Sequence, residues 1–151
     1  MSVAFVGLGS NLGDRAGHLR TALAAMQRHP SMSCLNISDF RRTDPMGGPE
    51  QPDYVNAAVR LETSLNPNAL LRWLLDLEAR EGRVRKVANG PRTLDLDLLL
   101  YGDHAQSSRD LELPHPRMTE RRFVLEPLAQ LAPRLPLVGG RTVVECLQSL
   151  A

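Results

Sequence analysis

The segment Pro91-Arg92-Thr93-Leu94-Asp95-Leu96-Asp97-Leu98-Leu99-Leu100 constrains the fold of this chain more than any other part of it. Its short apolar run predicts a strand that is buried on at least one face. Successive side chains of a strand point to opposite faces, so Asp95 and Asp97 share one face and the leucines between them share the other. Two neighbouring carboxylates on a half-buried strand repel each other unless a positive group lies between them.

Two kinds of positive group could balance this acidic pair. The first is a hard divalent cation, because Mg²⁺ is commonly held by one or two carboxylates together with substrate phosphates. The second is an ion pair between Asp97 and Arg92, which would serve only the structure. The strand by itself leaves both interpretations open.

The size and composition predict a single globular domain over residues 1–151. Hydrophobic residues make up 42% and charged residues 23%, which is typical of a folded protein. The net charge of +1 argues against a nucleic-acid-binding protein, since such domains are usually clearly basic. Cys34 and Cys146 lack metal-ligand spacing, so we expect a reducing, cytoplasmic location. No apolar run is long enough to cross a membrane.

The spacing of apolar residues predicts strands over 3–8, 33–40, 54–65 and 94–100. It predicts helices from a cap at Asp14 to His29 and from Asn66 to Gly82. The order strand, helix, strand, strand, helix, strand favours an α+β, ferredoxin-like βαββαβ sandwich: a mostly antiparallel sheet with helices packed on one face. We expect loops over 43–52 and 102–117. A C-terminal extension should hold short helices over 121–131 and 143–150.

Two further segments have features that suit phosphate binding. The glycine-rich stretch 7–13 matches neither the dinucleotide nor the phosphate-loop pattern, so a tight turn is the simpler interpretation, although Asn11 could offer its amide to a ligand. A basic segment before the acidic pair is either a solvated loop or a clamp on phosphate oxygens; it contains Arg83, Arg85, Lys86 and Arg92. Carboxylates and several arginines together are typical of phosphoryl transfer.

Tyr54 and Asn56 lie on one face of the third predicted strand. An aromatic ring and a carboxamide can hold a planar heterocycle, the ring by stacking and the amide by hydrogen bonds to its edge. The alternative is a core tyrosine beside a structural asparagine. His115 stands between two prolines, and taken alone it is best interpreted as a residue of a rigid loop.

Taken together, these segments resemble the 6-hydroxymethyl-7,8-dihydropterin pyrophosphokinase family of folate biosynthesis over almost the whole chain. The resemblance rests on Gly-Ser-Asn-Leu at 9–12, Gln-Pro-Asp-Tyr-Val-Asn-Ala at 51–57, Gly-Arg-Val-Arg at 82–85, the segment 90–97, and Pro114-His115 followed by Arg121 and Phe123. It implies the ferredoxin-like fold and transfer of pyrophosphate from ATP to the pterin's hydroxymethyl oxygen, with release of AMP. It also implies a monomer whose partners are ATP and a dihydropterin.

The resemblance assigns roles by motif matching. Asp95 and Asp97 would hold two Mg²⁺ ions that bridge the ATP phosphates, while the hydroxyl attacks the β-phosphorus in line with the departing AMP oxygen. The implied catalytic residues are this pair with Arg83, Arg85 and Arg92. The implied ATP contacts are Glu78, Arg83, Arg85, Arg92, Leu98, His115 and Arg121. The implied pterin contacts are Thr43, Pro45, Met46, Tyr54, Asn56, Asp95 and Phe123, with Tyr54 and Phe123 stacking on the ring. Segments 44–51 and 83–90 would close as lids.

Two positions depart from the pattern of the family. Asn89 and Arg41 stand where aromatic residues are common, and the loop at Asn89 is about one residue short. We therefore expect weakened sequestration of the substrate, which turnover and pterin affinity would report.

Two other functions fit parts of the sequence: a pterin- or nucleotide-binding relative with little catalysis, and a different two-metal enzyme such as a nucleotidyl transferase. The retained phosphate and metal residues disfavour the first, and the Tyr54–Asn56 pair disfavours the second.

Overall fold

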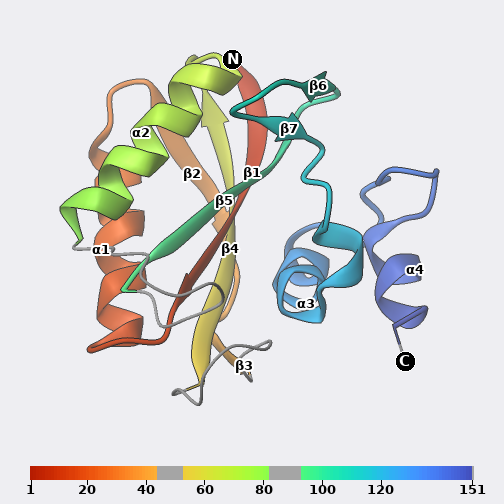
Figure 1. The fold of residues 1–151 in the computed structure, drawn as a ribbon, viewed down its shortest axis with the longest axis horizontal. Helices are drawn as coiled ribbons and strands as arrows, with labels where there is room; N and C mark the ends of the chain where they lie inside the picture. Colours follow the sequence, from red (N-terminus) through yellow and green to blue (C-terminus); the bar gives the residue numbers. More distant parts are fainter. Residues whose placement is uncertain (44–52, 82–92, 151) are drawn as a thin grey trace.

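The computed structural model describes residues 1–43, 53–81 and 93–150. Its main sheet has the strand order β2–β4–β1–β5, β3 also pairs with β4, and every pairing is antiparallel (Figure 1). The strands are β1 (Ser2–Ser10), β2 (Met32–Ile37), β3 (Arg41–Thr43), β4 (Tyr54–Thr63) and β5 (Asp95–Tyr101). The helices are α1 (Arg15–Arg28), α2 (Pro67–Arg80), α3 (Arg122–Leu131) and α4 (Val143–Gln148).

Each of the first two helices connects strands that lie two positions apart in the sheet. Helix α1 connects β1 to β2, with β4 between them, and α2 connects β4 to β5, with β1 between them. This interleaving of two split β-α-β units is the ferredoxin-like arrangement, so the predicted fold class is confirmed. The predicted helix starts are also confirmed: Asp14 accepts a hydrogen bond from Gly17 N at 3.0 Å, and Asn66 accepts one from Ala69 N at 2.8 Å.

Some predicted boundaries were wrong. The strand predicted over 33–40 covers Met32–Ile37. The short strand β3, at Arg41–Thr43, was not predicted, and its last residue lies in a predicted loop. The segment 102–117 is not all loop, because it contains the hairpin of β6 (Gln106–Ser107) and β7 (Glu112–Leu113). Strands this short carry too little alternation to stand out in a sequence.

Helices α1 and α2 cover one face of the sheet (Figure 1). The even-numbered residues of the central strand β1 point to this face, and so do the leucines that alternate with the two aspartates on β5. They form the first core with the apolar sides of both helices, including Val6, Leu8, Leu96, Leu98, Leu19, Met26, Leu70 and Leu74. This core carries the alternation that the sequence predicted.

The two helices of the predicted C-terminal extension, α3 and α4, pack on the opposite face (Figure 1). Phe5 and Leu99 point away from the first core. Both are apolar, and they are only 6% and 1% exposed because other residues cover them on this face. The second core that covers them consists of these two with Leu100, Met118, Val124, Leu125, Leu128, Leu137, Val143 and Cys146. Further along β1 the same face carries Gly7 and Gly9, and these positions matter for the site.

None of the helices in the described ranges is long and apolar enough to span a membrane.

We expect Leu74→Ala to lower the free energy of unfolding by about 2–5 kcal/mol, because it leaves a cavity in the first core. Leu74 is fully buried on α2. Its neighbour Leu75 is 48% exposed, so Leu75→Ala is a matched control that should change stability by no more than about 0.5 kcal/mol. Urea unfolding of both variants measures the difference; equal losses would contradict the described burial of α2.

Candidate active site

The acidic pair lies as the sequence predicted. Asp95 and Asp97 are both half-buried on one face of β5, whereas Leu94 and Leu96 are buried on the other. In the β1–β5 register Asp95 lies opposite Gly9, and Asp97 lies opposite Gly7. Opposed residues of an antiparallel pair point to the same face, so the positions next to the two carboxylates carry no side chain. A Cβ atom on Gly7 would lie 3.6 Å from Leu99 Cδ1, so the glycines let neighbouring side chains pack close to β1 beside the acidic pair.

The row of aligned positions continues across β1 to β4. Gly9 lies between Asp95 on one neighbouring strand and Asn56 on the other. A Cβ atom on Gly9 would lie 3.3 Å from Asn56 Oδ1 and 3.6 Å from Tyr54 Cδ1. The carboxamide and the phenol ring thus border the glycine, which confirms that Tyr54 and Asn56 share one face. Acidic, glycine and amide positions form one row over three adjacent strands.

Asn56 has an unusual hydrogen-bonding state for a buried residue. Asn56 is only 4% exposed, and its Nδ2 donates a hydrogen bond to Thr43 Oγ1 at 3.4 Å. Its Oδ1 accepts no hydrogen bond from any residue that the structure describes. A buried amide oxygen without a donor is costly, so this atom is suited to accept an N–H from the edge of a bound ring. The interpretation of Asn56 as a purely structural residue loses support.

His115 lies at the outer edge of β5. Its backbone N donates to Leu99 O at 2.9 Å, and its Nδ1 accepts from Arg117 N at 3.3 Å, which leaves Nε2 as the protonated nitrogen of the neutral ring. Burial lowers the pKa of His115, the charges of Arg121 and Arg117 lower it further, and Asp95 opposes them. Arg121, Asp95 and Arg117 therefore lie near His115, and its contact with ATP stays a prediction.

Arg121 lies at the start of α3 beside a predicted pterin contact. Its guanidinium carbon is 5.7 Å from the centre of the Phe123 ring, and its Nε is buried without a hydrogen-bond partner among the described residues. Phe123 and Thr43 both line one cavity of about 500 Å³, together with Arg42, Asp53, Glu120, Arg122, Glu126 and Leu150. The fold thus brings together two residues that are 80 positions apart in the sequence.

Two predicted ATP contacts lie in the interior. Glu78, on α2, is 2% exposed. Its Oε2 accepts a hydrogen bond at 2.6 Å from the backbone N of Leu96, the residue between Asp95 and Asp97. Leu98 is 3% exposed in the first core, which leaves its side chain little surface for a nucleotide. Glu78 therefore fixes the β5 backbone to α2 in this structure. The proposed contacts of both residues with ATP stay predictions.

The described residues contain no cluster of three or more His, Cys, Asp or Glu side chains that could hold a metal ion. Asp95 and Asp97 offer two carboxylates, which are hard oxygen ligands. A cation at this pair needs further ligands from substrate and water, and this is how Mg²⁺ is usually bound. The donor set fits Mg²⁺ and does not fit a closed zinc site, which needs nitrogen or sulfur ligands.

Several predictions fall outside the described residues. These are the roles of Pro45, Met46, Arg83, Arg85 and Arg92, the two lid segments, the substitution at Asn89, and the alternative pairing of Arg92 with Asp97. Sequence reasoning missed the part played by Gly7 and Gly9. Their alternation in the first strand was visible, but only the strand register places them opposite the aspartates.

Comparison with known proteins gives consistent matches. The sequence model of the family described as 7,8-dihydro-6-hydroxymethylpterin-pyrophosphokinase (HPPK) matches residues 5–133. The chain is 44% identical over 130 residues to the 2-amino-4-hydroxy-6-hydroxymethyldihydropteridine pyrophosphokinase of Bacillus subtilis, covering 86% of this chain and 78% of that protein. It is 43% identical over 150 residues to the protein of that name from Methylorubrum extorquens, covering 99% and 94%.

A solved structure supports the fold independently. It is described as an HPPK-DHPS in complex with substrates, and it superposes with a TM-score of 0.71 at 12% identity. The match covers 99% of this chain but only 45% of the solved chain, so this chain spans less than half of that protein.

We expect the stability of the protein to fall in mild acid through His115. The pKa of His115 is lowered from the ordinary value of 6.5, so the folded protein takes up this proton less readily than the unfolded chain. Its contribution is complete above about pH 6.5 and is lost as the pH falls through the lowered pKa. His115→Gln should flatten this part of the profile, and His104→Gln, at an exposed site, should not. Urea unfolding between pH 8 and pH 5 measures both, and identical profiles would contradict the assignment.

Proposed function

Because the chain belongs to the 7,8-dihydro-6-hydroxymethylpterin-pyrophosphokinase family, we propose that its glycine-lined surface holds the two substrates of that reaction side by side. The chain is a transferase of folate biosynthesis that moves pyrophosphate from ATP to 6-hydroxymethyl-7,8-dihydropterin. The row from Asp95 through Gly9 to Asn56 is the observation that carries the proposal, because it joins phosphate-type and heterocycle-type binding groups on one surface.

We assign the phosphate end of this surface to β5. Asp95 and Asp97 would hold Mg²⁺ together with substrate phosphates, and a bound Mg²⁺ would supply positive charge to neutralise that developing on the transferred group. Arg121 and the Nε2–H of neutral His115 are proposed to donate hydrogen bonds to phosphate oxygens. Arg83, Arg85 and Arg92 are assigned to the same triphosphate from the sequence alone.

The pterin end is assigned to β4 and α3. Asn56 Oδ1, which accepts no hydrogen bond among the described residues, is proposed to accept one from the ring edge. Tyr54 and Phe123 supply the stacking faces, and Thr43, which Asn56 contacts, borders the edge. The exposed Arg41 lies opposite Asn56 in the β3–β4 register, so the aromatic cover expected at that position is missing.

The chemistry then needs few protein groups. The pterin hydroxyl oxygen forms a bond to the β-phosphorus of ATP, the bond from that phosphorus to the α,β-bridging oxygen breaks, AMP leaves with the electron pair, and the hydroxyl proton is released to solvent. Holding the hydroxyl in line with the leaving oxygen supplies much of the rate. No general base is assigned, because a loose transition state does not require one before the P–O bond breaks.

The decisive assay is AMP release from Mg-ATP and the hydroxymethyl dihydropterin. We expect AMP from the wild-type protein, and a loss of about 100- to 1,000-fold in Asp97→Ala, because metal stabilisation of the transition state is worth several kcal/mol. The fold of this variant should persist, since the substitution removes one of two neighbouring like charges. Asp103→Ala, at an exposed position after β5, is the matched control and should keep activity.

Each other outcome of this assay has a defined meaning. Pterin binding without AMP formation would favour the binding relative with little catalysis. Loss of both would reject the pyrophosphokinase. Near-normal turnover in Asp97→Ala would reject the metal role of the pair.

We expect Arg121→Ala to raise the KM for ATP by about tenfold, the range of one charge-assisted hydrogen bond, with little change in pterin affinity. Arg134→Ala, at an exposed position after α3, controls for the loss of a positive charge. Steady-state kinetics and pterin titration separate the two effects. A selective loss of pterin binding would show instead that Arg121 acts through the Phe123 ring.

A further inference from the structure

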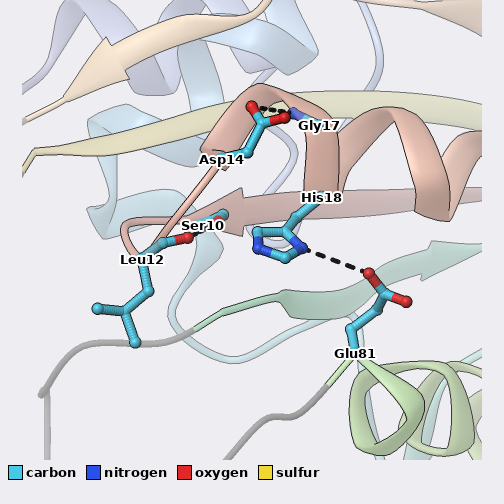
Figure 2. A network of polar contacts seen from close by, with 6 residues as sticks. All are labelled: Ser10, Leu12, Asp14, Gly17, His18 and Glu81. Carbon is cyan, nitrogen blue, oxygen red and sulfur yellow. Dashed lines mark hydrogen bonds and ion pairs between the residues drawn. The ribbon is translucent and has the colours of Figure 1, made fainter.

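The first turn of α1 is capped by Asp14, which follows the glycine-rich turn after β1 (Figure 2). Asp14 Oδ1 accepts from Gly17 N at 3.0 Å, and Asp14 O accepts from His18 N at 2.9 Å. Gly17 is required for this cap, because a Cβ atom there would lie 2.2 Å from Asp14 Oδ2. Ser10 Oγ donates to Leu12 O at 3.4 Å within the turn itself. The start of α1 is therefore a fixed platform beside the end of β1.

One side chain of this platform reaches the end of α2. His18 Nδ1 lies 3.3 Å from Glu81 Oε1, and the two side chains are only 26% and 21% exposed (Figure 2). Gly13 packs against the other side of the ring: it has φ +64°, and a Cβ atom there would lie 3.3 Å from His18 Nε2. Glu81 N donates to Glu78 O at 3.2 Å, and Glu78 in turn accepts the Leu96 N–H between the two aspartates of β5.

A second side chain of the same turn reaches the start of β4. Arg15 Nη1 donates to Asp53 O at 2.7 Å. Asp53 directly precedes Tyr54 in the sequence, and Asn56 follows two residues later. A charged donor on a backbone oxygen at this distance is among the stronger protein hydrogen bonds.

We propose that Arg15 and His18 are positioning residues, which set the two substrate-binding ends of the site from a single helical turn. Arg15 fixes the chain where it enters the pterin-binding strand, and His18 fixes the end of α2, whose Glu78 holds the β5 backbone between Asp95 and Asp97. Both act through another residue, Asp53 or Glu81. The inference rests on the proposed division of the site into an ATP end and a pterin end.

A positioning role makes a prediction that a merely structural role does not. If the two contacts only stabilise the fold, each substitution should lower the affinity for both ligands equally, or for neither. If each contact sets one end of the site, the two substitutions should have opposite selectivity. The reason is that Arg15 and His18 lie three residues apart on one helix but contact different parts of the chain. Arg15 contacts Asp53, before β4, and His18 contacts Glu81, after α2.

The experiment measures two affinities by calorimetry: that of a non-hydrolysable ATP analogue with Mg²⁺, and that of the dihydropterin with this analogue at saturation. His18→Ala should lower the affinity for the analogue about three- to fivefold, the range of one partly exposed hydrogen bond, and leave the affinity for the pterin within about twofold. Arg15→Ala should lower the affinity for the pterin about tenfold and leave the affinity for the analogue within about twofold. Arg20→Ala and His104→Ala, both at exposed positions, are matched controls and should bind as wild type.

Further variants keep the proposal open to refutation if an alanine variant unfolds. Glu81→Ala should reproduce His18→Ala, and the double variant should be no worse than either alone. Arg15→Lys should recover most of the pterin affinity because it retains a charged donor. Equal losses for both ligands, unchanged affinities, or additive effects of His18→Ala and Glu81→Ala would overturn the proposal. Wild-type AMP release is measured alongside: if it is present, such failures reject only the positioning role, and if it is absent, the function itself fails.

Discussion

The pairing of β5 with β1 is the constraint on which the rest of the site depends. It sets Asp95 opposite Gly9 and Asp97 opposite Gly7, so two carboxylates border a strip of backbone without side chains. A shift of this register by one residue would turn the carboxylates into the first core and the leucines toward solvent. Glu78 reinforces the strand from α2 by accepting the Leu96 N–H, between the two aspartates of β5.

The two faces of the sheet have different tasks because they are covered to different extents. Helices α1 and α2 cover one face along its length, and this face carries most of the apolar burial. On the other face, α3 and α4 cover the region around Phe5 and Leu99. The part that carries Gly7 and Gly9 borders the acidic pair on one side and the Asn56 amide on the other. Packing and ligand binding thus share one face without competing for the same positions.

Much of the fold followed from local patterns. Alternation of Asp95 and Asp97 with leucines predicted the strand and its two faces, and the caps at Asp14 and Asn66 predicted where two helices begin. The second core was missed, because Phe5 and Leu99 each sit in strands that already alternate correctly toward the first core. Short elements such as β3 and the β6–β7 hairpin were missed because two or three residues do not define a period.

The sequence by itself determined the chemistry of this protein: two carboxylates, several arginines, and an aromatic ring near an amide, in the order typical of one family. Only the tertiary structure decided which of these groups meet. The strand register placed glycines between Asp95 and Asn56, and burial left the Asn56 Oδ1 without a donor among the described residues. These outcomes depend on pairings between distant segments. A local pattern fixes the face on which a side chain lies, but it cannot fix its neighbour on the next strand.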